Sequence, residues 1–161
     1  MKPSSSIVDF GAIDTCEGDV HHEIELVLKI GADNEPTHMA LGLDLTKRSI
    51  QDHLKEKSLP WAEAKAFTGS AVLGEWVEYN PKAEYSLEIN GNEVQRGSLA
   101  EMSWTPNQLI AKLANWATIC EGDILFTGTP SGVGPLTKND EVTASLYIEG
   151  AHILSHHAKC V

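Results

Sequence analysis

The sequence predicts a mainly β protein with few helices, built as a single domain over residues 1–161. Short apolar runs alternate with polar residues between positions 21 and 46, which is typical of strands. Two residue pairs typical of tight hairpin turns, Asn90-Gly91 and Glu149-Gly150, occur later in the chain. Residues 105–122 form the clearest predicted helix, and few other segments favour one. We therefore expect strands to dominate.

The first half of the chain contains two predicted strands and one predicted helix. Residues 21–31 indicate a strand that ends at Gly31, and residues 40–46 indicate a second strand. Residues 46–60 favour a helix, with Thr46 or a neighbour as its cap and Pro60 as its stop. The helix is expected to follow the second strand directly.

The second half contains two predicted hairpins separated by a helix and a short strand. The hairpins cover residues 85–98 and 141–161. The helix of residues 105–122 begins at Thr105 and Pro106 and ends at Gly122. Its apolar stripe consists of Leu109, Ile110, Leu113 and Trp116. Residues 123–128 then predict a short strand.

The composition excludes several classes of partner. Twelve basic residues against 23 acidic ones give a net charge of −11, which argues against nucleic acid or an anionic membrane as the main partner. An anionic substrate stays open, because a bound cation can reverse the local field. No apolar run has membrane-spanning length, and residues 1–10 lack the apolar stretch of a signal peptide. With three cysteines that have no metal-like spacing, we expect a cytoplasmic protein with reduced thiols.

Two carboxylates share one face of the first predicted strand. Alternation places an apolar series on the core face: His22, Ile24, Leu26, Leu28 and Ile30. Glu23 and Glu25 lie on the opposite face, with their Cα atoms about 6.6 Å apart. Carboxylates this close repel each other, and a divalent cation between them would remove that penalty. A hydrated strand edge is the simpler alternative for this segment.

A third carboxylate favours the metal interpretation. Asp44 lies in the middle of the apolar second strand, where an unpaired charge is costly. Three carboxylates without a nearby cysteine make an all-oxygen site, which suits Mg²⁺, Mn²⁺ or Ca²⁺. Such a site leaves positions for water or substrate and suits catalysis.

A loop rich in glycine and threonine follows the short strand. The segment GDILFTGTPSGVGPL contains Gly128, Gly132 and Thr129. Glycines let backbone N–H groups face an anion, and hydroxyls can donate to a carboxylate. The segment lacks the Gly-Lys-Ser/Thr ending of a phosphate-binding loop. An ordinary turn remains the alternative.

The chain resembles a known family. The segments HHEIEL, LGLDLTKRSIQ, LPWAEAKAF and GDILFTGTPSGVGPL occur in the order seen in the fumarylacetoacetate hydrolase family. Within that family the sequence is most similar to the acylpyruvate hydrolase and oxaloacetate decarboxylase branch. The resemblance covers nearly the whole chain. It implies a mixed β-barrel or roll with few helices, which agrees with the elements predicted above.

The resemblance also implies a set of site residues. The metal ligands of the family, usually for Mg²⁺ or Mn²⁺, fall on Glu23, Glu25 and Asp44. The family's catalytic lysine matches Lys65. Its substrate-binding residues match Arg48, Gln51 and Thr129. Without the resemblance, the lysine reads as a surface residue, and the arginine and glutamine read as the solvated face of a helix.

The implied substrate is a small 2-oxo acid. The implied reactions are hydrolysis of acylpyruvates and decarboxylation of oxaloacetate, both of which break a carbon–carbon bond. One alternative is an isomerase of unsaturated 2-oxo dicarboxylates, which uses the same metal site. Another is a catalytically weak metal-binding domain. The resemblance also implies a homodimer, and four tryptophans in a short chain suggest apolar surface to cover.

The sequence departs from the family pattern in two places. The family's stretch before Lys2-Pro3 contributes a strand and a lid with a catalytic histidine–glutamate pair, and no counterpart precedes it here. The connection between the two metal-ligand strands is also shorter than usual. The first departure leaves the identity of the general base open, and His21, on the glutamate face, is the better candidate among the histidines beside the metal strand.

Overall fold

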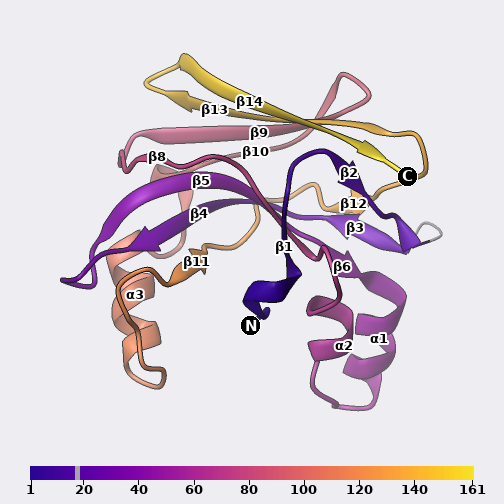
Figure 1. Ribbon diagram of the computed structural model, residues 1–161, viewed down its shortest axis with the longest axis horizontal. Helices are drawn as coiled ribbons and strands as arrows, with labels where there is room; N and C mark the ends of the chain where they lie inside the picture. The colour runs from indigo at the N-terminus through magenta and orange to yellow at the C-terminus, as the bar shows by residue number, and fades with distance from the viewer. Residues whose placement is uncertain (17–18) are drawn as a thin grey trace.

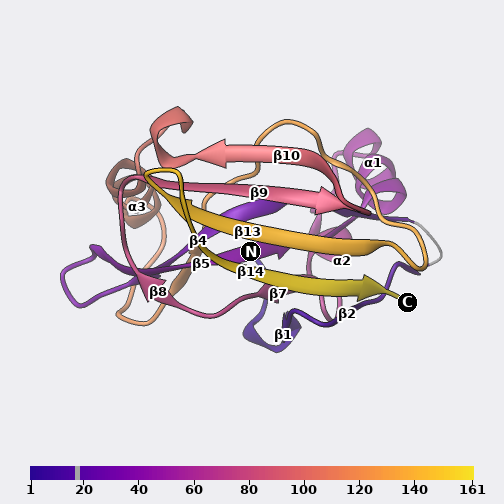
Figure 2. The ribbon, with the colours of Figure 1, turned by 90° about the horizontal axis from the view of Figure 1, so that it is seen from above.

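The computed structural model describes residues 1–16 and 19–161 and consists of two facing β-sheets, a small third sheet and three short α-helices (Figure 1). The helices lie on the outer side of the first sheet, and the second sheet covers its other side (Figure 1). Figure 2 shows the strands of the second sheet from above. The sheets form an open roll rather than a closed barrel.

The first sheet carries the two strands expected to hold the carboxylates. Its order is β1-β7-β5-β4-β11, and β8 pairs with β5. The strands are β1 (Ile7–Asp9), β4 (Ile24–Ile30), β5 (Pro36–Asp44), β7 (Ala71–Leu73), β8 (Val77–Glu78) and β11 (Ile124–Phe126). β4 and β5 are antiparallel neighbours, and Glu25 lies opposite Gly42.

The second and third sheets complete the roll. The second has the order β10-β9-β13-β14-β2, and the third has the order β12-β3-β6. Their strands are β2 (Ala12–Ile13), β3 (Val20–His22), β6 (Thr46–Lys47), β9 (Ala83–Ile89), β10 (Asn92–Ser98), β12 (Gly134–Pro135), β13 (Glu141–Ile148) and β14 (Ala151–Cys160). The helices are α1 (Arg48–Glu56), α2 (Ala62–Lys65) and α3 (Pro106–Ala114), with 3₁₀ turns η1 (Ser4–Ser6) and η3 (Leu99–Glu101).

The main core fills the space between the two large sheets. Its largest fully buried side chains include Ile24, Leu26, Leu28, Leu41, Leu43, Leu87 and Leu146. Alternate residues of β4 and β5 therefore face the second sheet, as the sequence predicted. On the opposite face, the described residues form a smaller buried apolar cluster of Val27, Ala40 and Leu73. The face with less apolar cover is the one that carries the acidic residues.

Both predicted hairpin turns are confirmed. Asn90 and Gly91 have φ values of 53° and 76°, and Glu149 and Gly150 have values of 52° and 78°. Two successive positive φ angles are the mark of a type I′ turn, whose twist matches that of the flanking strands. The short strand predicted over residues 123–128 is also present, as β11.

The strand predicted over residues 21–31 is interrupted at Glu23. β3 pairs with β6 and β12 in the third sheet, whereas β4 pairs with β5 and β11 in the first. The chain therefore passes from one sheet to another at Glu23. The second predicted strand is longer than expected, because β5 begins at Pro36, and it breaks at Leu45 before β6.

Both predicted helices are shorter than expected, and the N-cap residue of α1 is Lys47, the neighbour of Thr46. α1 has no capping side chain of its own. Instead, Asp19 Oδ1 accepts from Ser49 N at 2.8 Å. α3 has the predicted Thr105 cap, as part of a capping box, but ends at Ala114. Trp116 therefore lies beyond the helix and is 69% exposed instead of completing its apolar stripe.

Several expectations concern the molecule as a whole. Among the described residues, no helix is long and apolar enough to cross a membrane. All three cysteines are free, as expected. The homodimer remains a prediction, since the structure describes a single chain. Trp104 and Trp116 are among the large apolar side chains exposed on its surface.

The loop between β11 and β12 passes very close to β10. Gly132 has a φ of 102°, and a Cβ atom there would lie 2.0 Å from the carbonyl oxygen of Val94. We expect Gly132→Ala to lower the free energy of unfolding by about 1–3 kcal/mol more than backbone strain alone does. The control is Gly91→Ala, where φ is also positive but the space is open, so it measures a strain of about 1–2 kcal/mol. Urea unfolding checks both, and equal losses would contradict the close approach.

Candidate metal centre

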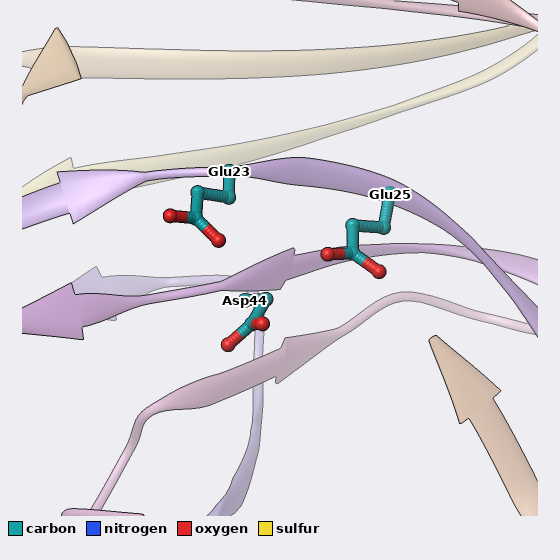
Figure 3. A group of neighbouring side chains, drawn as sticks. All are labelled: Glu23, Glu25 and Asp44. Atoms are coloured by element: carbon teal, nitrogen blue, oxygen red, sulfur yellow. The ribbon is translucent and has the colours of Figure 1, made fainter. Parts of the chain in front are cut away.

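The three predicted carboxylates converge on the outer face of the first sheet. Glu23 and Glu25 project from the β3–β4 segment, and Asp44 projects from the end of β5 (Figure 3). The amide of Asp44 donates to the carbonyl oxygen of Glu23 at 2.9 Å, which places these two residues opposite each other. One carboxylate oxygen from each residue lies within 4.8 Å of the others. Although the connection between the two strands was expected to be shorter than is usual in the family, Asp44 still lies beside the two glutamates.

Glu25 is the most buried of the three carboxylates. Its side chain is enclosed, with only 3% of the residue exposed, and its Oε2 accepts a 2.7 Å hydrogen bond from the amide of Gly128. Burial, followed by the charge of Asp44, raises the pKa of Glu25 to about 8. The amide of Gly128 opposes this shift only in part. At neutral pH, Glu25 therefore binds a proton in the metal-free protein.

Lys65 bridges the other two carboxylates. Its Nζ lies 2.8 Å from Glu23 Oε2 and 3.0 Å from Asp44 Oδ2. Lys65 is the last residue of α2, a four-residue helix, so its position depends on how that helix packs below the sheet. A cation thus already lies between two of the three predicted ligands.

Arg48 and Gln51 meet at the edge of the same cluster. Arg48 Nη2 donates to Glu23 Oε1 at 2.6 Å, and Nη1 donates to Gln51 Oε1 at 2.7 Å. Both residues belong to the first turn of α1, and Gln51 is only 3% exposed. The prediction that these side chains lie at the site, and not on a solvated helix face, agrees with this geometry.

Lys2 is a site residue that the sequence analysis did not identify. Its Nζ donates to three backbone carbonyls, those of Leu45, Lys65 and Ser70, and lies 2.8 Å from Asp44 Oδ1. Four oxygens therefore surround an ammonium group that has three hydrogens. Asp44 Oδ1 therefore forms an ion pair but has no hydrogen-bond partner among the described residues. Burial lowers the pKa of Lys2 against the opposing effect of Asp44.

Thr129 lies on the other side of the cluster and binds Gln95. Gln95 Nε2 donates to Thr129 Oγ1 at 2.9 Å. The sequence analysis missed Gln95, which is 2% exposed and sits across from Leu87 in the β9–β10 hairpin. That register was the available signal, because it places a polar side chain at a core-facing position.

His21, the candidate base, lies on β3 beside this cluster. It is half-buried, and burial together with the nearby charge of Arg48 lowers its pKa. Its role as a base remains a prediction.

Two cavities flank the carboxylates. One, of about 530 Å³, is lined by Lys2, Asp44, Trp61 and Lys65, among others. The second, of about 260 Å³, is lined by Tyr85, Trp104, Gly128 and Thr129, among others. Asp44 borders the first cavity, and Gly128, which binds Glu25, borders the second. The carboxylate cluster therefore lies between two spaces that a small molecule could enter.

The donor set fits a hard divalent cation. All three candidate ligands are carboxylates, which Mg²⁺, Mn²⁺ and Ca²⁺ prefer. Asp44 Oδ1 has an unused lone pair, and Lys65 already supplies positive charge between Glu23 and Asp44. The residues present could therefore hold such an ion without a change of ligand chemistry.

The fold and the site together define a class of protein: an open β-roll with a carboxylate triad and a lysine on the outer face of one sheet. The model of the fumarylacetoacetate (FAA) hydrolase C-terminal family matches residues 1–157, and the chain belongs to this family.

Relatives and solved structures agree with this assignment. The oxaloacetate tautomerase YcgM of Escherichia coli (strain K12) is 36% identical over 167 residues, which cover 90% of this chain and 75% of that protein. Yeast ynq8, a fumarylacetoacetate hydrolase family protein, matches 99% of this chain and 83% of its own, with a TM-score of 0.91 and 27% identity. Fumarylpyruvate hydrolase from Pseudomonas aeruginosa, solved with Mn²⁺ and pyruvate, covers 99% and 76% of the two chains, with a TM-score of 0.88 and 27% identity.

The pKa of Glu25 predicts a pH-dependent stability of the metal-free protein. The folded value of about 8 exceeds the unfolded value of 4.5, so the folded state binds the extra proton. The contribution of this proton is complete below pH 4.5 and is lost as the pH rises toward 8. We expect the stability difference between wild type and Glu25→Gln to change by up to about 1.4 kcal/mol per pH unit in this window. Urea unfolding in chelator measures it, and a difference independent of pH would contradict the assignment.

Proposed function

We propose that this protein is a divalent-metal-dependent enzyme that acts on a small 2-oxo acid, with oxaloacetate as its first substrate. The observation that carries the proposal is the triad of Glu23, Glu25 and Asp44 with Lys65 bound between two of its members. Its relatives include oxaloacetate tautomerases, and a structural neighbour was solved with Mn²⁺ and pyruvate. Mg²⁺ and Mn²⁺ are both candidates for the ion.

A bound ion would act as a Lewis acid on the 2-oxo group of the substrate. The ammonium of Lys65 uses two of the same carboxylate oxygens that the ion needs. Competition for these oxygens would release Lys65 from Glu23 and Asp44, so that it could face the negative charge that develops on the substrate. Lys65 thus has two roles in this proposal, balancing the carboxylates in the free protein and stabilising the enolate during the reaction.

Arg48, Gln51 and Thr129 would orient the substrate. Arg48 and Gln51 lie on the Glu23 side of the triad and Thr129 on the Gly128 side. Hydrogen-bond donors on opposite sides can fix both ends of a planar 2-oxo acid, which converts binding into a defined orientation. Arg48 would keep its bond to Glu23 and use its remaining N–H groups for the substrate.

Enolate stabilisation serves both candidate reactions. Keto–enol tautomerisation of oxaloacetate needs a proton moved between carbon and oxygen, and this activity is named for the 36% identical bacterial relative. Cleavage of a carbon–carbon bond leaves an enolate of the same kind, and the similarity to fumarylpyruvate hydrolase supports it as the second candidate. We place tautomerisation first, because that relative is the more similar in sequence.

Metal binding is the first test. We expect Asp44→Asn to weaken Mg²⁺ and Mn²⁺ binding strongly, because it removes one of three charged ligands. The matched control is Asp33→Asn, the same change at an exposed position in the β4–β5 turn. Calorimetric titration of the protein after treatment with a chelator measures both. Binding that is equal in wild type and Asp44→Asn would exclude this triad as the metal site.

Turnover of oxaloacetate is the second test. We expect Lys65→Met to lower kcat about a hundredfold to a thousandfold, as removal of one stabiliser of developing negative charge typically does. The control Lys57→Met removes an exposed lysine just after α1 and should leave activity unchanged. The enol and keto forms are followed by ultraviolet absorbance and pyruvate release by a coupled assay, in parallel with an acylpyruvate. If the Mn²⁺-loaded protein converts none of these compounds, the proposal is wrong.

A further inference from the structure

A buried glutamine sits between the interior of the roll and the substrate side of the metal centre. Gln95 is 2% exposed and makes four hydrogen bonds. Its Oε1 accepts from Ile24 N at 3.2 Å and lies 2.8 Å from His22 Nδ1. Its Nε2 donates to Thr129 Oγ1 and to the carbonyl of Pro130, both at 2.9 Å. The amide therefore links the start of β4 to the loop after β11.

Backbone groups determine which way this amide faces. The amide of Ile24 can only donate, so the atom that faces it must be the oxygen of Gln95. The carbonyl of Pro130 can only accept, so the atom that faces it must be the nitrogen. The two backbone partners, Ile24 N and the Pro130 carbonyl, thus leave a single orientation for the amide.

This orientation determines the role of the Thr129 hydroxyl. Because Gln95 Nε2 can only donate, Thr129 Oγ1 must accept from it. The hydrogen of the Thr129 hydroxyl then remains available for another acceptor. Thr129 lines the cavity of about 260 Å³ on the Glu25 side of the triad. A hydroxyl donor on a residue that lines this cavity suits a carboxylate or carbonyl oxygen of a substrate.

The neighbouring loop packs closely against β10 at one end and is bonded to the triad at the other. Gly132 lies so close to β10 that a Cβ atom would be 2.0 Å from the Val94 oxygen and 3.2 Å from Gln95 Cγ. Gly128 lies just after the end of β11, and its amide donates a hydrogen bond to Glu25. Thr129 is therefore bracketed by two contacts, and Gln95 adds the bond that orients its hydroxyl.

We propose that Gln95 is a positioning residue that makes the Thr129 hydroxyl a hydrogen-bond donor to the substrate. The inference rests on the proposed function, since it needs a 2-oxo acid in the cavity beside Thr129. It goes further by assigning a role to a side chain that touches neither the ion nor the substrate.

The test compares two substitutions of similar length. In Gln95→Met the bond to Thr129 is lost, and the hydroxyl is free to rotate. In Gln95→Glu the new carboxylate can only accept hydrogen bonds. The Thr129 hydroxyl then donates its hydrogen bond to this carboxylate and no longer to the cavity. We expect the Kd for pyruvate in the Mn²⁺-loaded protein to rise modestly in the first variant and about tenfold to a hundredfold in the second, as for a lost bond to a charged group. The Kd for Mn²⁺ should change far less in both.

A double-mutant cycle with Thr129→Val separates positioning from other effects. If Gln95 acts through the hydroxyl, neither Gln95 substitution should weaken pyruvate binding further once the hydroxyl is absent. An electrostatic effect of the new carboxylate would persist in that background. Asn92→Asp, which adds the same charge at an exposed position on β10, controls for net charge and should leave both constants unchanged.

Several results would overturn the proposal while leaving the proposed function intact. One is additive loss of pyruvate binding in the double mutants, and another is a parallel weakening of Mn²⁺ and pyruvate binding, which indicates a structural role. Failure of both Gln95 variants to unfold cooperatively would also indicate a structural role only. If wild type binds Mn²⁺ but no pyruvate and converts no oxaloacetate, the proposed function and this inference are both wrong.

Discussion

The antiparallel pairing of β4 with β5 is the constraint on which the site depends. One face of both strands packs into the main core through residues such as Leu26 and Leu43, so their register cannot slip by one residue without exposing that core. The same register places Asp44 across from Glu23, joined by a 2.9 Å backbone bond. Packing of the hydrophobic core thus holds three carboxylates close together although their charges repel one another.

Basic residues from three distant parts of the chain compensate the negative charge of Glu23 and Asp44. Lys2 comes from the start of the sequence, Arg48 from the first turn of α1 and Lys65 from the end of α2. Among the described residues, Glu25 forms no ion pair and accepts a hydrogen bond from the amide of Gly128, and burial raises its pKa to about 8 although the charge of Lys65 opposes the shift. Burying a charged group without a partner is costly, so the positions of these helices are coupled to the carboxylates.

The sequence predicted what depends on local pattern and missed what depends on long-range contacts. Alternation identified the core face and the triad, and turn chemistry located both hairpins. The roles of Lys2 and Gln95 were not predictable in this way, because their partners lie tens of residues away in sequence. The same holds for the first turn of α1, where the N-cap residue Lys47 forms no capping bond and Asp19 accepts from the amide of Ser49. The strand predicted over residues 21–31 is broken at Glu23, because the chain passes there from the third sheet to the first.

Lysine and arginine are used differently at the two ends of Glu23. The guanidinium of Arg48 is planar and binds Glu23 and Gln51 with separate nitrogens, which holds one carboxylate oxygen in a set direction. The ammonium of Lys65 is a point charge on a flexible stem and bridges two carboxylates without a required plane. In the proposed function Lys65 leaves these oxygens when an ion binds, and a flexible point charge suits that release. Under that proposal, the arginine holds Glu23 in place and the lysine can release its two carboxylates.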